Sequence, residues 1–489
     1  MHLPYACSCC SPAPGLTRRR LLLGAAGAGA GALLAGCAAT GGGVAPAGNS
    51  YVLRGGHVIS MDPAVGDIAG ADVLVQGGRI AAIGTGLAVG DAQVVDARGM
   101  IVMPGFVETH WHMWNSLLKN MLRPGVEYFG LKAGLIEHHR PLDYYRANRL
   151  AIVEAINAGF TTVNNFAHNT RTPAHVDAEL QALAEIGIRA RYSYGYIDPM
   201  PAEQTMPLAD LRRVKAQWFG SGSPFGDRVD LGVALRGDQG STREVFRQEL
   251  QVARELGLPK VMHIGQSRRF RVNVAELVRL GFIDPQTLLV HGMAATPEDR
   301  AAMASLGLSL SVSPQSELRL AGDGDYREQL LQMLAAKINV CFSIDATSLG
   351  TVSPFDAMNT TWSLGIPWTQ TPSEKLPRVD FDQCLQMATI NGARALGLQD
   401  RIGSLAPGKQ ADIVLVRTTD LNMSPLGEPR SAVVRSATPA NVDTVIVGGR
   451  FLKRGGRLIG VDPAQVMADA EESLRAIRQR AGGAWAPKA

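Results

Sequence analysis

Two histidines separated by one residue, His110 and His112, have the spacing that points most directly to chemistry. They follow an apolar run at residues 101–106, which predicts that they lie on a β-strand. Side chains two positions apart on a strand project to the same side, so one metal ion can bind both imidazoles. The pattern also fits two strand histidines that are only hydrogen-bonded, so further ligands are needed to decide.

Three single polar residues later in the chain are candidates for those further ligands. His263, His291 and Asp345 each close a short apolar run. In a parallel barrel, the carboxyl ends of the strands carry their side chains to the mouth. The sequence therefore predicts a metal site assembled from several strand ends.

The elements that must position these residues alternate between apolar strand-like runs and helical patterns, which is typical of βαβ units. Eight such strands are enough to close a (β/α)8 TIM-type barrel. We expect them near residues 102–110, 161–168, 188–196, 229–236, 260–265, 287–291, 307–312 and 339–345.

The two ends of the folded body share a second sequence pattern, in which short strand-like runs alternate with glycine-rich turns. It occurs at residues 51–103 and again at 403–460, which predicts one small β-sandwich domain built from both ends of the chain. The barrel then occupies residues 104–402. Residues 461–489 are expected to form a C-terminal helix and tail that serve packing.

The first 37 residues have the features of an export signal and are set aside from the fold. Arg18 and Arg19 belong to a twin-arginine-like motif, and the apolar stretch after them is shorter than the roughly 20 residues that span a bilayer. The stretch ends in a lipobox-like sequence before Cys37, whose lipidation would anchor the protein on the outer side of the bacterial membrane. A plain cleaved signal is the alternative. Residues 38–50 would then be a flexible tether.

The charge and cysteine content argue against a nucleic-acid-binding protein and against a fold held by disulfides. The formal net charge is only +4, and three of the arginines lie in the signal, so no nucleic-acid footprint is implied. Of six cysteines, Cys341 and Cys384 remain for the folded body. Both lie in apolar patterns and are expected in the core without a disulfide.

The ordered set of histidines and aspartate resembles the amidohydrolase superfamily, in the branch that holds cytosine deaminase, adenosine and methylthioadenosine deaminases, and triazine hydrolases. The resemblance covers nearly the whole chain after residue 50. The phrases that carry it lie at residues 77–84, 104–112, 387–397 and 402–413.

The resemblance implies that His110, His112, His263 and Asp345 bind one divalent ion, Zn²⁺ or Fe²⁺, with His291 close beside it. Such an ion activates a water molecule. Asp345 would accept the proton of this water, and His291 would hydrogen-bond the attacking group or polarise the substrate. Two-metal relatives carry a carbamylated lysine at the end of strand four, where this chain has Arg236, so a single ion is expected.

Gln266 is the main departure from the pattern of this branch. Its deaminases usually have glutamate three residues after the strand-five histidine, and a glutamine amide cannot deliver a proton. Glutamine here is similar to some imidazolonepropionases. We therefore expect hydrolysis of a non-peptide C–N bond in an amide, urea or carbamate, with Gln266 orienting the substrate.

Two alternatives remain open. The first is a deaminase or dechlorinase of a purine, pyrimidine or triazine-like ring, in which another acid replaces the missing glutamate. The second is a catalytically silent ligand-binding lipoprotein, which the intact ligand set argues against. For the amide-type hydrolase and for the deaminase alike, the expected partner is a small heterocyclic or aromatic molecule. A homo-oligomer is also expected.

Five other residues are candidates for substrate binding. Trp114 and Asn115 lie in the loop after the His-x-His strand, where Trp114 can wall a ring. His168 can contact substrate or cap a loop. Arg236 can clamp a substrate carboxylate or carbonyl, or form a salt bridge within the barrel. Glu317 stands where similar chains often have asparagine, and so can change substrate choice.

Overall fold

The computed structural model describes residues 50–486, except 89, 266, 321–324 and 366–377. The proposed export signal, nearly all of the tether, and Gln266 lie outside the described residues. In the described part of the chain, no helix combines the length and the apolarity needed to cross a membrane.

The central barrel has eight strands in the described part of the chain, and each pairs in parallel with the next. They are β6 (Phe106–Trp111), β7 (Phe160–Ala167), β8 (Arg189–Tyr194), β9 (Val229–Leu235), β10 (Lys260–His263), β11 (Thr287–Val290), β12 (Ser309–Val312) and β13 (Asn339–Phe342). Two backbone hydrogen bonds join the last strand region to the first, from Asp345 N–H to the His110 oxygen (2.9 Å) and from His112 N–H to the Asp345 oxygen (2.8 Å). The predicted barrel and its eight strands are confirmed.

The first predicted strand differs from the observed one. Residues 102–110 were expected to form a single strand, but β5 (Met100–Pro104) belongs to a second sheet and the barrel strand begins only at Phe106. The chain passes between the sheets at Gly105, where an added Cβ would lie 2.0 Å from Thr161 Cγ2. A side chain cannot fit there, so glycine is required at this close approach.

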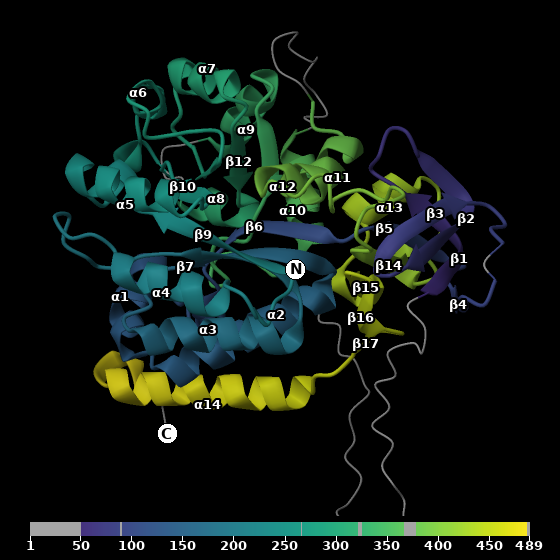
Figure 1. Cartoon of the computed structure of the whole chain (residues 1–489), viewed down its shortest axis with the longest axis horizontal. Coiled ribbons are helices and arrows are strands. Elements are labelled where there is room, and N and C mark those ends of the chain that lie inside the picture. The colour runs from purple at the N-terminus through teal and green to yellow at the C-terminus, as the bar shows by residue number, and fades with distance from the viewer. Residues whose placement is uncertain (1–49, 89, 266, 321–324, 366–377, 487–489) are drawn as a thin grey trace, which may run out of the picture. The chain divides into compact units, whose positions relative to one another are not determined.

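Helices alternate with the barrel strands and surround them (Figure 1). Those before β13 are α1 (Tyr128–Leu135), α2 (Pro141–Ala158), α3 (Pro173–Ile186), α4 (Leu208–Trp218), α5 (Arg243–Glu255), α6 (Val274–Arg279), α7 (Pro297–Ser305), α8 (Pro314–Leu320) and α9 (Tyr326–Ala335). Those after it are α10 (Pro354–Gly365), α11 (Phe381–Ala388), α12 (Ile390–Ala395) and α13 (Pro429–Arg435). Local signals set their ends: α7 starts with proline after a capping box between Thr296 and Asp299, and α2 stops at Gly159 with φ 97°.

The second sheet has nine strands among the described residues and draws on both ends of the chain, as predicted. From the front end come β1 (Ser50–Ile59), β2 (Asp67–Gln76), β3 (Arg79–Gly84), β4 (Gln93–Asp96) and β5, and from the back end β14 (Ile413–Arg417), β15 (Val442–Val447), β16 (Arg450–Arg454) and β17 (Arg457–Leu458). Strands β5 and β14 join the two sets as antiparallel neighbours. Hydrogen bonds link all of these strands into one continuous sheet, where the sequence suggested a sandwich.

A buried ion pair ties the barrel to this sheet. Arg189 opens β8, and its guanidinium donates from Nε to Asp412 Oδ2 (2.7 Å) and from Nη2 to Asp412 Oδ1 (3.1 Å). The two side chains are 2% and 1% exposed. Because the contact is bidentate and excluded from water, removing either partner would leave an uncompensated buried charge.

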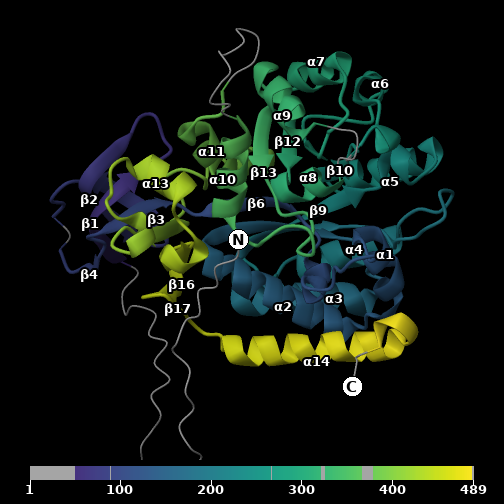
Figure 2. The same cartoon turned by 180° about the vertical axis from the view of Figure 1, so that it is seen from behind.

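The C-terminal helix α14 (Pro463–Ala481) runs beside α2, as both views show (Figures 1 and 2). Its Ala470 and Ile477 pack in one apolar cluster with Tyr144 of α2. Arg480 pairs with Asp143 at one end of the contact. The helix therefore packs against α2.

The two cysteines of the folded body are both buried and free. Cys341 lies in β13 and Cys384 in α11, which confirms the expectation for both.

Candidate active site

The candidate site lies where several barrel strands end. His110 is in β6, His263 ends β10, and His291 and Asp345 follow β11 and β13. One ligand atom from each of these four side chains lies within 4.8 Å of the others. A set of side chains far apart in sequence therefore converges at one end of the barrel, as expected for parallel strands.

His112 belongs to the same group through the carboxylate of Asp345. Asp345 Oδ1 lies 3.3 Å from His110 Nε2 and 3.3 Å from His112 Nε2. His263 Nε2 lies 3.2 Å from His110 Nε2. The structure thus brings together the four residues proposed as metal ligands, with His291 beside them.

Two of these residues adopt an uncommon backbone conformation. His291 has φ 74° and Asp345 has φ 64°, in the left-handed region that side chains larger than glycine rarely occupy. Hydrogen bonds to neighbouring strands hold both, with His291 N–H donating to the Ser311 oxygen at 2.9 Å. Such conformations cost about 1–3 kcal/mol each and concentrate at functional sites.

The protonation states of the clustered histidines and of Asp345 favour binding of a cation. Burial lowers the pKa of His110 to about 3 and the pKa of His263 well below its usual value, so both imidazoles are neutral. Burial opposes ionisation of Asp345, but hydrogen bonds with His110 and His112 hold its pKa well below the usual range. Neutral imidazoles and one carboxylate form the donor set that zinc and ferrous iron accept.

A buried nitrogen without a partner gives a second test of this fit. His291 Nε2 is buried and has no hydrogen-bond partner in the described structure. His110 Nε2 and His263 Nε2 lie 3.2 Å apart, close enough for one cation to contact both. The residues present therefore fit a divalent metal ion.

Glu317 was expected to contact substrate, and the structure gives it another neighbour. Its Oε1 lies 3.1 Å from His291 Nδ1, and both side chains are fully buried. Glu317 lies in the first turn of α8, next to Ser316, whose hydroxyl donates to Asp345 Oδ2. This loop therefore supports two site residues from behind.

Arg236 is engaged in a salt bridge within the barrel, the second of its two expected roles. Its Nη2 lies 3.2 Å from Glu249 Oε1, and its Nη1 donates to the backbone oxygen of Pro201 at 3.0 Å. The side chain is 2% exposed. The structure therefore supports the salt-bridge role, and a contact of Arg236 with substrate stays a prediction.

Three other residues proposed to bind substrate are His168, Trp114 and Asn115. The ring centre of His168 is 4.3 Å from that of His112, and Trp114 follows at 5.8 Å from His168. Asn115 uses its side-chain oxygen to accept from Thr347 N–H at 3.2 Å. Trp114 Nε1 is buried and has no hydrogen-bond partner among the described residues. Gln266 is outside the described residues.

The buried carboxyl group of Glu108 was not predicted from the sequence. Its Oε1 accepts from the backbone N–H of His110 at 2.6 Å, which fixes the strand that carries the histidine pair. The signal for it was an acidic residue two positions before His110 in an otherwise apolar strand.

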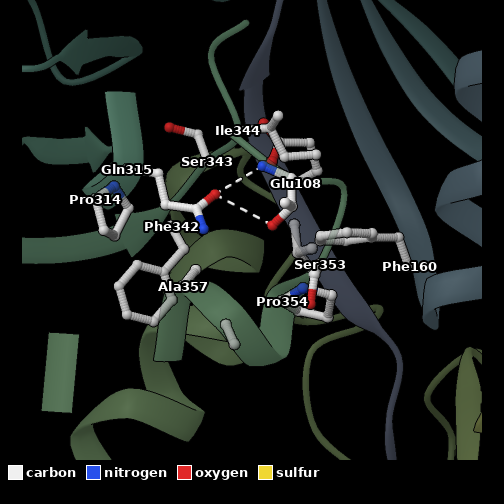
Figure 3. A pocket seen from close by; sticks show the side chains of 13 residues that line it. Glu108, Phe160, Pro314, Gln315, Phe342, Ser343, Ile344, Ser353, Pro354 and Ala357 are labelled. Atoms are coloured by element: carbon white, nitrogen blue, oxygen red, sulfur yellow. Dashed lines mark hydrogen bonds between the residues drawn. The ribbon is translucent and has the colours of Figure 1, made fainter. Parts of the chain in front are cut away.

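Glu108 also lines a small cavity, together with Gln315, Pro354 and other residues (Figure 3). There the side-chain oxygen of Gln315 accepts from Thr351 N–H at 2.7 Å. At about 20 Å³, this cavity has room for a water molecule and none for a substrate.

The chain is similar to several known proteins. The family model described as "Amidohydrolase family" matches residues 101–452. A 5'-deoxyadenosine deaminase of Methanothermobacter thermautotrophicus is 30% identical over 83% of this chain and 94% of its own length. A 5-methylthioadenosine/S-adenosylhomocysteine deaminase of Moorella thermoacetica is 29% identical over 78% of this chain and 88% of its own.

Solved structures share the fold. An adenosine deaminase from Xanthomonas campestris with bound zinc superimposes with a TM-score of 0.77 at 23% identity, covering 88% of this chain and 98% of its own. An atrazine chlorohydrolase from Arthrobacter aurescens, complexed with zinc, gives 0.74 at 20% identity, covering 86% and 99%. At these identities the likeness concerns the fold alone.

Proposed function

Because the chain belongs to the amidohydrolase family, we propose that it hydrolyses a C–N bond of a small heterocyclic molecule at a single divalent metal ion. The observation that carries the proposal is the buried group of His110, His263, His291 and Asp345, with ligand atoms within 4.8 Å of one another. His112, 3.3 Å from Asp345, completes the set. The zinc bound by two proteins of the same fold makes Zn²⁺ the ion we propose.

A bound ion would lower the pKa of a water molecule to about 7 and so make hydroxide available at neutral pH. His110, His112, His263 and Asp345 would hold the ion. A second ion is not expected, because Arg236, at the end of strand four, is committed to its salt bridge.

Asp345 is the group best placed to move a proton. Its carboxylate is ionised, and Ser316 hydrogen-bonds one of its oxygens while two histidines approach the other. Asp345 can therefore accept a proton from the attacking water and return it to the leaving nitrogen. Among the described residues His291 Nε2 has no partner, so we propose that it contacts substrate or water.

Among C–N bonds, we place the exocyclic amine of an adenine-type nucleoside first. Support comes from two curated relatives, a 5'-deoxyadenosine deaminase that matches 83% of this chain and a 5-methylthioadenosine/S-adenosylhomocysteine deaminase that matches 78%. The second candidate is a cyclic amide, urea or carbamate. The presence of glutamine at position 266 favours that alternative, because an amide cannot shuttle the proton that deamination uses.

A product screen tests the proposal and separates the two candidates. Purified protein should contain one equivalent of zinc, and chelation should abolish turnover. We expect ammonia release from 5'-deoxyadenosine or a related amine, without ring opening of lactams or cyclic ureas. Two equivalents of metal, or no hydrolysis of any compound in either class by zinc-loaded protein, would contradict the proposal.

The Gln266→Glu variant provides the matched comparison for the reaction type. A deaminase should keep or increase ammonia release when the carboxylate is introduced, because the new group can carry a proton to the ring. An enzyme for amide-type cleavage should lose activity or change modestly. Asp345→Asn is the control for both, since it removes a ligand and a base together.

We also propose that the enzyme works outside the cytoplasmic membrane as a lipoprotein. Support comes from the twin-arginine-like motif at Arg18 and Arg19 and from the lipobox-like sequence that ends at Cys37. Twin-arginine export carries folded proteins, which suits an enzyme that acquires its metal before it leaves the cytoplasm.

A further inference from the structure

Glu317 and His291 form a fully buried pair at the edge of the candidate site. The carboxylate oxygen Oε1 lies 3.1 Å from His291 Nδ1, and both side chains are 0% exposed. The second oxygen of Glu317 and the second nitrogen of His291 have no hydrogen-bond partner in the described structure. Each side chain therefore contributes one partnered atom and one free atom.

This pairing is costly if it serves only packing. A buried carboxylate with an unpartnered oxygen is less favourable than an apolar side chain of similar size. His291 also holds a left-handed backbone conformation, with φ 74°. Two unfavourable features at one contact indicate that it is kept for the site and not for the core.

A neutral His291 paired with an ionised Glu317 would be restricted to one tautomer. A neutral imidazole carries its proton on one nitrogen and an electron pair on the other, whereas an ionised carboxylate only accepts hydrogen bonds. If Glu317 accepts from Nδ1, the proton lies on Nδ1 and the electron pair lies on Nε2. A carboxylate that accepts from one ring nitrogen fixes the tautomer in this way.

We propose that Glu317 is a positioning residue that holds His291 in the Nδ1–H tautomer, so that Nε2 accepts a hydrogen bond from the attacking water or from a substrate amino group. The inference rests on the proposed function, which it deepens by giving His291 one of two possible roles. An acceptor at Nε2 cannot polarise a substrate carbonyl oxygen. It matches a substrate that presents N–H groups, such as an aminated heterocycle.

The test compares zinc-loaded wild type with Glu317→Gln and Glu317→Leu. Protein labelled with ¹⁵N-histidine reports the tautomer of each ring, and a His291→Asn variant assigns the His291 signals. We expect wild type to show protonated Nδ1. Glutamine can donate or accept, and leucine can do neither, so both variants should populate a mixture of tautomers.

Steady-state kinetics supply the second measurement. Loss of an orienting partner typically lowers activity by about 10–100-fold, and loss of the correct histidine tautomer by up to about 10⁴-fold. We expect kcat to fall at least tenfold in both variants, with KM within about threefold of wild type. Glu179→Gln is the matched control, because Glu179 is an equally buried carboxyl group on α3. It should leave kcat and the His291 signals unchanged.

Three results would overturn the inference: a wild-type His291 protonated on Nε2, an unchanged tautomer in both Glu317 variants, or an equal loss of kcat in Glu179→Gln. Because Glu317→Gln preserves shape, it keeps the test decisive if the leucine variant does not fold. If wild type turns over none of the substrates, the proposed function fails, and the tautomer measurement still decides the role of Glu317.

Discussion

Replacing Glu179 by glutamine should stabilise the folded barrel at neutral and alkaline pH and leave its stability in acid nearly unchanged. Glu179 lies on α3 and is fully buried. Its carboxylate accepts from Tyr192 Oη at 2.8 Å and from Asn148 Nδ2 at 3.0 Å. Burial raises its pKa from 4.5 to about 7, although these hydrogen bonds and one from Asn165 oppose the rise.

The sign of the effect follows from comparing the folded and unfolded states. Below pH 4.5 the carboxyl group is protonated in both states and carries no penalty. As pH rises from 4.5 toward 7, the unfolded chain releases the proton while the folded chain keeps it, so the free energy of unfolding falls. Above about pH 7 the folded protein holds a buried charge, and the loss is complete.

The size of the effect follows from the same pKa values. A rise from 4.5 to about 7, at about 1.4 kcal/mol for each pKa unit, corresponds to about 3 kcal/mol. Glutamine is neutral at every pH and can donate to Tyr192 while it accepts from Asn148. The stability advantage of Glu179→Gln over wild type should therefore grow by about 2–3 kcal/mol between pH 5 and pH 8.

Urea denaturation at pH 5, 6, 7 and 8 measures this difference directly. Glu185→Gln is the matched control, because Glu185 lies on the same helix with an exposed side chain bonded to Tyr145 Oη. The control should track wild type at every pH. A difference between Glu179→Gln and wild type that stays constant from pH 5 to pH 8 would refute the assignment of the raised pKa to Glu179.

Three further changes test the site, the joint between the sheets and the anchor. Asp345→Asn should fold normally, as thermal denaturation would show, and lose at least about 1,000-fold in kcat; near-normal turnover would remove Asp345 from the mechanism. Arg189→Met leaves Asp412 buried and unpaired, so urea denaturation should show a loss of about 3–5 kcal/mol, and a loss under about 1 kcal/mol would contradict the ion-pair argument. Cys37→Ser should be exported but recovered outside the membrane fraction, and unchanged attachment on fractionation would argue against lipidation.

Much of the site was predictable from sequence because of how a parallel barrel is made. Its strands are buried on both faces and so appear as continuous apolar runs, and a single polar residue at the end of a run stands out. His263, His291 and Asp345 were found in this way, and the structure places them together with His110. The split of the first strand was not predicted, because the apolar run continues across Gly105 while the chain changes sheets.

Partner choice among buried polar side chains was decided only by the tertiary structure. Arg236 pairs with Glu249, 13 residues away, and Glu317 pairs with His291, 26 residues away. Residue type alone allows each charged side chain several partners. The distance between two charged side chains depends on the order of the strands and on which helix faces each strand. The substrate roles first considered for Arg236 and Glu317 were chemically reasonable, and packing gave both side chains protein partners.

By itself, the sequence determined the order of strands and helices and the side chains that end at the barrel mouth, since both follow from the period and burial of local segments. Only the tertiary structure decided which nitrogen of His291 is occupied, that Ser316 supports Asp345, and that Glu179 is enclosed by Tyr192 and Asn148. These features depend on distances of a few ångströms between separate elements. No local pattern of residues encodes such distances.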